Sequence, residues 1–562
     1  MVLRNTQRKH IGIEKHNRIE KHIALEKHTG IEKHIGLEKH IGLEKHIEKT
    51  HWYIEINSYK DTHWLEKQRA ETSQQGNFNN LKGIIHMMQM SKRKVAGVVA
   101  AAVLGAQLWA SAVPVYAQEV NSLSETPTHQ VARTTQETLA DWEAWTRDHA
   151  YRLETIKPVE GKIEPGSFKD LDMLKPLLHD KRIVFLGESS HGVAEFNQAK
   201  TRLIQYLHEE MGYNVLAFES GLSNTSIAYG NAASQSAEQT MKDSIFGVWW
   251  SKEILPLFNY LKDTQTSENP LMLTGFDIQM QFPLMNGKWL QDAKQAERLK
   301  QAEEKLAAYA GGTDLEGYQK DKNHLMGIYN ETLRTLKAKG SEEHIKALYP
   351  SNPALIKQLE RSLQDRIRAA DEYVELSIKS NRGYEEEDYA VYAEYLLKSM
   401  EWRDQAMQDN LIWLATEVYP NEKFIVWGHN DHIQKAHSEV MGTYYPVKQM
   451  GELLPEEWKK YSYVLGLYPV SGKTADNTGA IHDVLPFEEG SIESIVSKAS
   501  QSPYTFIDLK YRNNERGNSW MFEPRYTYSW GMIPESLVAR DQYDGLLLID
   551  NVHPPQYIRN HK

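Results

Sequence analysis

The sequence predicts an α/β fold: a central, mainly parallel sheet flanked by helices, with a helical insertion forming a wall or lid over the sheet. From residue 118 onward, short β-branched or aromatic runs alternate with long amphipathic runs, which is typical of βαβ units. The region 289–420 has a helical pattern throughout. A chain of 562 residues can bury a large core and still carry additions.

Short apolar runs bounded by turn residues are the predicted strands of the sheet. They cover residues 182–186, 214–218, 271–275, 424–428, 463–467, 504–508 and 545–550. In the predicted insertion, Leu355, Leu359, Leu363 and Ile367 recur every four residues and form one apolar stripe on a helix. We therefore expect 289–420 to pack as a helical subdomain over the sheet.

Composition excludes several classes of protein. The chain has no cysteine, so disulfides, thiolate nucleophiles and cysteine-ligated metal sites are absent. The net charge is −11, yet residues 1–89 hold 15 Lys and Arg against 11 Asp and Glu. Residues 118–562 alone carry −18. This acidic balance argues against nucleic acid as a partner.

Residues 1–89 form a low-complexity leader rich in Lys, Glu and His. Its first half repeats a six-residue unit with histidine at positions 10, 16, 22, 28, 34, 40 and 46. Six residues turn a helix through about 600°, so these histidines form no single stripe. The leader is either a disordered or untranslated segment or a histidine-rich metal-binding tract.

Residues 90–117 have the form of a signal peptide. Lys92, Arg93 and Lys94 precede the apolar stretch 95–115, and small residues at Val115 and Ala117 predict cleavage after Ala117. An uncleaved membrane anchor is the alternative. With cleavage, we expect a secreted or extracytoplasmic catalytic domain, residues 118–562, without stable membrane insertion.

The segment RIVFLGESSHGVAEF, residues 182–196, places a polar turn between a strand and a helix. Apolar residues recur behind the turn at helical spacing, at positions Val193, Phe196, Leu203, Ile204, Leu207 and Met211. That helix packs on the sheet and presents the turn at the carboxyl end of its strand. Open α/β sheets bind their ligands at this edge.

Four predicted strands end in side chains that can transfer protons. These side chains are Glu188 and His191 after the first strand, Glu219 after the second, Asp277 after the third, and His429, Asn430 and His432 after the fourth. Four such strand ends point to one shared site. Carboxylates and imidazoles without a side-chain nucleophile suit activation of water by general base catalysis.

Ser189 and Ser190 do not form the Gly-x-Ser-x-Gly nucleophile elbow, and a histidine one or two residues away is badly placed to deprotonate them. We expect both serines to serve as turn and helix-capping residues. No glycine-rich, phosphate-cradling loop with a lysine is present.

The chain resembles the erythromycin esterase family. FLGESSHGVAEF is similar to that family's Gly-Glu-x-x-His-Gly-x-x-Glu motif, and NVLAFES, GFDIQ, MEWRDQAMQDNL and VWGHNDH match its later blocks in order, over about residues 135–555. The resemblance implies a sheet with a deep cleft and a helical subdomain. It also implies hydrolysis of a macrolide lactone by an activated water without a cofactor, and hence a possible role in antibiotic resistance.

The resemblance implies roles for particular residues. His191 matches the general base, and Glu188 would orient its imidazole. Glu219 matches the acidic residue of the second block, and either His429 or His432 would stabilise the oxyanion or protonate the leaving alkoxide. Arg403 would supply a fixed positive charge or form a buried ion pair. The expected substrate-binding residues are Glu195, Asp277, Asn430, Trp249 and Trp250.

Two alternatives stay open. The same histidines and carboxylates would suit a divalent metal such as zinc or manganese, whose bound water would do the same hydrolysis. Trp249, Trp250 and Trp530 would equally suit an exported binding protein with a degenerate site. The substrate is a small-molecule ester, either a macrolide or an unrelated one. The sequence does not indicate the oligomeric state.

Overall fold

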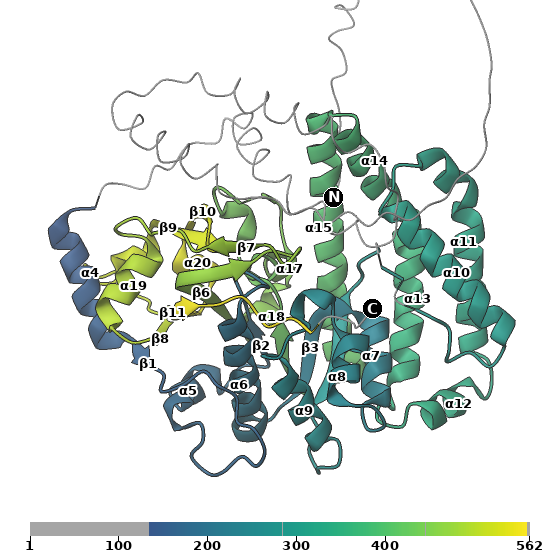
Figure 1. Cartoon of the computed structure of the whole chain (residues 1–562), viewed down its shortest axis with the longest axis horizontal. Helices are drawn as coiled ribbons and strands as arrows, with labels where there is room; N and C mark the ends of the chain where they lie inside the picture. The colour runs from purple at the N-terminus through teal and green to yellow at the C-terminus, as the bar shows by residue number, and fades with distance from the viewer. Residues whose placement is uncertain (1–133, 281, 284, 444, 559–562) are drawn as a thin grey trace, which may run out of the picture. The chain divides into compact units, whose positions relative to one another are not determined.

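A computed structural model of the chain describes residues 134–280, 282–283, 285–443 and 445–558 (Figure 1). The predicted leader, the signal peptide and its cleavage site lie outside these residues. None of the helices in this part of the chain combines the length and the apolar character needed to span a membrane.

The predicted central sheet is confirmed in the described residues. Its strands lie in the order β1 (Tyr151–Arg152), β8 (Tyr504–Asp508), β11 (Gly545–Val552), β6 (Ser462–Ala475), β2 (Ile183–Leu186), β5 (Lys423–Trp427), β3 (Tyr213–Gly221) and β4 (Met272–Asp277). The run from β11 to β4 is parallel throughout. β8 pairs antiparallel with β11, and β1 pairs antiparallel with β8. β7 (Ile481–Asp483) pairs antiparallel with the end of β6. The sheet is mainly parallel because each crossover connection returns the chain to the end of the sheet at which the strands begin.

Helices cover both faces of the sheet, because its central strands are apolar on both sides. Ile183 and Phe185 of β2 pack toward α4 (Gln136–His149), α15 (Tyr389–Trp413) and α19 (Ile492–Ser500). Val184 and Leu186 pack toward α5 (Leu174–Leu178), α6 (Ala194–Met211), α8 (Ala237–Ser244) and α9 (Leu255–Thr264). This alternation buries every side chain of β2.

The region 289–420 is helical in the structure. It contains α10 (Ala293–Ala310), α11 (Leu315–Leu336), α12 (Ser341–Leu348), α13 (Leu355–Glu372), α14 (Val374–Glu385) and α15, which Figure 1 shows gathered beside α7 (Leu222–Asn231). The predicted stripe of α13 packs into a core shared by the helical region and the segment after β4, with Leu355, Leu359 and Leu363 fully covered and Ile367 partly covered. The Arg366 guanidinium donates to the carbonyl oxygen of Ile278 at 3.2 Å, which ties α13 to the segment after β4. A deep cleft beside this wall stays a prediction.

The strand predictions missed the short strands β1 and β7 and two further features. β6 extends to Ala475, far beyond the predicted end at 467, and β9 (Pro524–Ser529) pairs with β10 (Ile533–Val538) as a separate hairpin. The alternating aromatic residues of β9 are typical of a strand. From the sequence, however, this segment was noted only for its aromatic content and was not predicted to be a strand. The remaining short helices are α16 (Asn430–Ile433), α17 (Met450–Leu453), α18 (Glu456–Lys460) and α20 (Ala539–Gln542), and single turns of other helix types occupy Lys169–Leu171, Gly247–Trp249, Leu414–Val418, His437–Glu439 and Ser519–Phe522.

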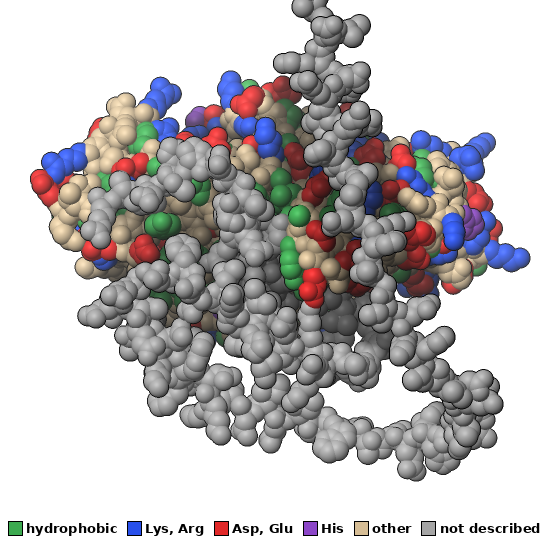
Figure 2. Space-filling view, turned by 90° about the horizontal axis from the view of Figure 1, so that it is seen from above, with side chains coloured by type: hydrophobic (Ala, Val, Ile, Leu, Met, Phe, Trp, Pro, Cys, Tyr) green, Lys and Arg blue, Asp and Glu red, His purple; other side chains and the backbone are tan. Residues whose placement is uncertain are grey.

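Charged side chains are mixed in sign on the surface of this part of the chain. On the uncovered portion of the face in Figure 2, Lys and Arg lie among Asp and Glu, and no patch of one sign gathers there.

The 187–192 loop is bound to β6 at both of its ends. The Gly187 N–H donates to the Leu465 carbonyl at 2.8 Å, and the Ala475 N–H donates to the Gly192 carbonyl at 2.9 Å. The extension of β6 beyond its predicted end therefore holds the second end of this loop.

Replacing Gly192 with alanine should detach one end of the loop. A Cβ at this position would lie 2.0 Å from the Ala475 carbonyl oxygen, so the two segments would have to separate. We expect Gly192→Ala to lower the free energy of unfolding by about 2 kcal/mol, measured by urea denaturation.

Gly327→Ala is the matched control. Gly327 lies in α11 with no atom within 4 Å of an added Cβ, so alanine should raise stability by about 1 kcal/mol through helix propensity. Equal effects of the two substitutions would contradict the close packing inferred at Gly192.

Candidate active site

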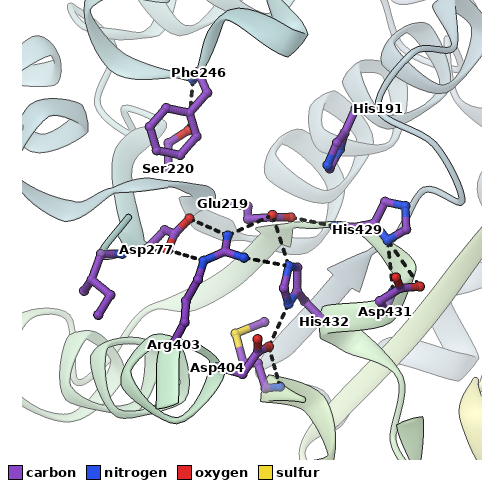
Figure 3. Close-up of polar contacts among 12 residues, drawn as sticks. His191, Glu219, Ser220, Phe246, Asp277, Arg403, Asp404, His429, Asp431 and His432 are labelled. Carbon is purple, nitrogen blue, oxygen red and sulfur yellow. Dashed lines mark hydrogen bonds and ion pairs between the residues drawn. The ribbon is translucent and has the colours of Figure 1, made fainter. Parts of the chain in front are cut away.

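The four polar strand ends come together in the structure. β2, β5, β3 and β4 are consecutive in the sheet and parallel, so their carboxyl ends open at one edge. Figure 3 shows Glu219, Asp277, His429 and His432 converging there, with His191 beside them. The sequence predicted these strand ends without predicting their order in the sheet.

His191 is oriented by Glu188. Its Nδ1 lies 2.7 Å from Glu188 Oε1, which also accepts a hydrogen bond from Trp249 Nε1 at 2.8 Å. The second carboxylate oxygen, Oε2, accepts from Lys200 Nζ at 2.8 Å. Glu188 and Lys200 are fully buried, whereas the His191 side chain keeps 12% of its surface exposed. His191 is therefore held on one side and accessible on the other.

The Glu188–Lys200 pair sets the charge behind His191. Burial alone would raise the pKa of Glu188, but the Lys200 ammonium and the His191 contact bring that pKa below its ordinary value. Burial lowers the pKa of Lys200 to about 8, against the opposing attraction of Glu188. The Lys200 ammonium also lies 4.0 Å from the centre of the Trp427 ring, a cation–π contact. At neutral pH Glu188 is thus an anion that can stabilise an imidazolium at His191.

Glu219 links three parts of the site. Its Oε2 accepts a hydrogen bond from the backbone N–H of His429 at 2.7 Å. Its Oε1 lies 3.3 Å from His432 Nε2 and 3.4 Å from an Arg403 guanidinium nitrogen. Burial would raise the pKa of Glu219, but His432 and the other nearby cations hold it well below the ordinary value. Glu219 is therefore a buried carboxylate with partners on both oxygens.

Arg403 forms a buried ion pair, which is one of the two roles that the sequence left open for it. Its guanidinium donates to Asp277 through two bonds, Nε to Oδ1 at 3.0 Å and a terminal nitrogen to Oδ2 at 2.7 Å. Although burial opposes charge, Asp277 and Glu219 raise the pKa of Arg403 further above its ordinary value. Arg403 thus brings a fixed positive charge from α15 to the ends of β3 and β4.

His432 is engaged through both ring nitrogens. Nδ1 lies 2.7 Å from Asp404 Oδ1, and Nε2 faces Glu219. Burial disfavours the charged ring, but the two carboxylates raise the pKa of His432 well above its ordinary value. As an imidazolium, His432 donates to Asp404 and Glu219 and has no N–H left for a substrate.

His429 is engaged on one side alone. Its Nδ1 lies 3.3 Å from Asp431 Oδ1, while Nε2 is buried and has no hydrogen-bond partner among the described residues. Its pKa is raised, because Asp431 outweighs the effect of burial. The His429 and His191 rings have centroids 5.0 Å apart. Of the two histidines in the VWGHNDH block, His429 is therefore the one with a free donor.

The remaining predicted substrate-binding residues have partners within the fold. Asn430 donates to the Leu467 carbonyl at 3.2 Å, and its Oδ1 is buried without a partner in the described part of the chain. Trp250 donates to the Ile245 carbonyl at 2.9 Å. Glu195 accepts from the backbone N–H of His553 at 2.7 Å and lies 2.8 Å from its Nδ1. Trp249 and Asp277 contact the histidine and arginine cluster directly.

The turn role expected of the serines is confirmed for Ser190, and the helix-capping role is wrong. Ser190 Oγ accepts from the Gly192 N–H at 3.2 Å and donates to the Ala475 carbonyl at 3.3 Å. Helix α6 has Val193 at its N-cap, and a valine side chain has no acceptor with which to cap the helix.

Three residues of the cluster escaped the sequence analysis as site residues: Lys200, Asp404 and Asp431. Trp530 was named only for the binding-protein alternative. Lys200 carried a signal, since it falls four residues after Phe196 on the apolar stripe of α6, where a lysine must be buried with a partner. Asp404 and Asp431 lie inside the blocks that were quoted, next to residues that were chosen.

The donor set does not fit a resident metal ion. No group of three or more His, Asp and Glu side chains in the described residues is arranged to hold one. Ammonium, guanidinium and imidazole groups already occupy the oxygens of Glu188, Glu219 and Asp277.

Comparison with known proteins extends these observations. The sequence profile of the family described as erythromycin esterase matches residues 208–552. The "Putative hydrolase YbfO" of Bacillus subtilis (strain 168) is 33% identical over 429 residues, covering 74% of this chain and 92% of that protein. Erythromycin esterase type II of Escherichia coli is 22% identical over 351 residues, covering 59% of this chain and 78% of that protein.

A solved structure supports the fold. The crystal structure of a succinoglycan biosynthesis protein, 19% identical in sequence, superposes with a TM-score of 0.56 over 76% of this chain and all of that one. Because the profile spans more than half of the chain and the Bacillus subtilis relative exceeds 30% identity over most of its length, the chain belongs to the erythromycin esterase family, which supports a hydrolase activity.

Proposed function

We propose that this hydrolase cleaves carboxylic esters with a water molecule activated by His191, without a metal and without a covalent intermediate. The observation that carries the proposal is the pair formed by His191 and His429. One ring is backed by a buried anion and accessible to solvent, and the other offers an unpartnered nitrogen nearby.

His191 acts as the general base. Because Nδ1–H of His191 donates to Glu188, the lone pair for proton transfer lies on Nε2. Nε2 takes one proton from water while the water oxygen bonds to the ester carbonyl carbon. The Glu188 carboxylate stabilises the imidazolium that forms, and Lys200 keeps Glu188 ionised.

His429 stabilises the tetrahedral intermediate. Its Nε2–H donates to the developing oxyanion, an interaction that strengthens as negative charge grows on that oxygen. His432 and Arg403 do not donate to the substrate, because their N–H groups are directed to Glu219, Asp404 and Asp277. The carbon–oxygen bond to the alkoxide then breaks, and the alkoxide takes its proton from the His191 imidazolium.

A macrolide lactone is the first substrate to test. The family and the name of the Escherichia coli relative support this choice. A lactone offers one ester carbonyl, and its hydrolysis adds one water without releasing a fragment, which mass spectrometry detects directly. Hydrolysis of simple aryl esters but of no macrolide would keep the esterase proposal and reject the lactone.

His191→Ala should lower kcat by at least 100-fold, since general base catalysis contributes a factor of this size or more. The measurement is the rate of water addition to a 14-membered macrolide, followed by mass spectrometry. His324→Ala, a change on the exposed side of α11, serves as the control and should match the unsubstituted protein. Comparable rates for the two variants would reject His191 as the base.

The pH dependence of kcat should reflect the titration of His429. Because the pKa of His429 is raised, its ring keeps the second proton to higher pH than an ordinary histidine and loses it as the pH rises further, so kcat should fall on the alkaline side. Asp431→Asn removes the carboxylate that raises this pKa. We expect the alkaline limb of the kcat profile to move to lower pH in this variant, and an unmoved limb would contradict the role of His429.

Chelation should leave turnover unchanged. Protein dialysed against EDTA should keep its kcat within a factor of two, and added zinc or manganese should not raise it. Loss of activity on dialysis, restored by one of these metals, would favour the metal-dependent alternative.

A further inference from the structure

Trp530 has an unusual backbone conformation for an aromatic residue. It follows β9 in the tight connection to β10 with φ of +56°, and Gly531 follows with φ of +73°. In the left-handed region the Cβ of an L-residue crowds the neighbouring carbonyl, which is why glycine, asparagine and aspartate are preferred there. A bulky side chain in this conformation is typical of a functional site.

The backbone of Trp530 is fixed on both sides. Its N–H donates to the Ser189 carbonyl at 2.7 Å, and its carbonyl accepts from Thr474 Oγ1 at 3.0 Å. Ser189 belongs to the 187–192 loop, and Thr474 belongs to the far end of β6. The β9–β10 hairpin is therefore docked on the loop that carries His191.

The indole of Trp530 lies against both histidines of the pair. It stacks on the His429 ring with centroids 5.2 Å apart and an interplanar angle of 26°. It meets the His191 ring edge-on, with centroids 5.5 Å apart and an angle of 88°. The face of an indole attracts a cation within about 6 Å of its centre. Trp530 is thus placed to favour the charged form of His429.

We propose that Trp530 is a positioning residue for His429: the chain accepts a left-handed backbone at Trp530 so that the indole holds the His429 imidazole in place and stabilises its positive charge. This inference rests on the proposed function for its effect on turnover. A purely structural residue at this turn would follow the backbone preference, which glycine or asparagine satisfies better.

Three substitutions separate the ring from the backbone. Trp530→Ala and Trp530→Gly both remove the indole, so both should lower kcat at least tenfold and move the alkaline limb of the pH profile to lower pH. Trp530→Phe keeps an aromatic face, so its kcat should stay above those of both variants. In thermal unfolding, Trp530→Gly should melt at a higher temperature than Trp530→Ala, because glycine adopts the left-handed conformation without strain.

Gln501 provides a matched control. It also has a positive φ, of +52°, and it ends helix α19. Gln501→Gly should likewise melt at a higher temperature than Gln501→Ala, while both keep the kcat of the unsubstituted protein. This pair shows the effect of the backbone conformation without a change at the histidines.

A titration of His429 tests the inference without any substrate. In protein labelled with ¹³C-histidine, the His429 ring signal is assigned as the one that disappears in His429→Asn. Its NMR titration midpoint should lie at lower pH in Trp530→Ala and Trp530→Gly than in the unsubstituted protein. An unmoved midpoint, or a kcat within twofold of the unsubstituted protein in both variants, would overturn the inference. If no ester is hydrolysed at all, the proposed function fails and the midpoint still decides the role of Trp530.

Discussion

The neutralisation of the buried Glu219 carboxylate is the constraint on which the rest of the site depends. A carboxylate removed from water is costly unless its oxygens receive charged or hydrogen-bonding partners. Those partners come from three elements: the His429 N–H after β5, the His432 ring of α16 and the Arg403 guanidinium of α15. Satisfying this one carboxylate therefore ties α15 and the segment after β5 to the end of β3 and orients the His432 ring.

The same constraint gives the three imidazoles different chemistry. His432 lies between two carboxylates and has no donor to spare. His429 has one carboxylate neighbour and one free nitrogen, which suits it to meet negative charge on a substrate. His191 has one carboxylate neighbour and remains accessible, which suits it to meet water. The number of partners around each ring, rather than its residue type, separates their roles.

Rigidity around His191 comes from segments distant in sequence. The 187–192 loop is bound along β6, and the β9–β10 hairpin reaches it through Trp530. Behind the loop, Lys200 of α6 and Trp249 hold Glu188 from two further directions. A side chain held on several sides, such as the proposed base His191, loses little freedom when substrate binds, which favours reaction over rearrangement.

The sequence by itself determined the local features of this protein. The apolar runs identified all six parallel strands, the stripe of Leu355, Leu359 and Leu363 identified the buried face of α13, and the polar strand ends identified Glu188, Glu219, Asp277 and His429. These features depend on periodicity and on residues next to each other in the chain, which a sequence displays directly.

Only the tertiary structure decided which of these residues act together. The order of the strands made four separated ends neighbours, and it brought Arg403 onto Asp277 across 126 positions of the chain. The roles proposed for His429 and His432 follow from their carboxylate partners, and those proposed for Lys200 and Trp530 follow from what each side chain contacts. Contacts between distant segments depend on packing and charge balance in three dimensions, which no local pattern of residues encodes.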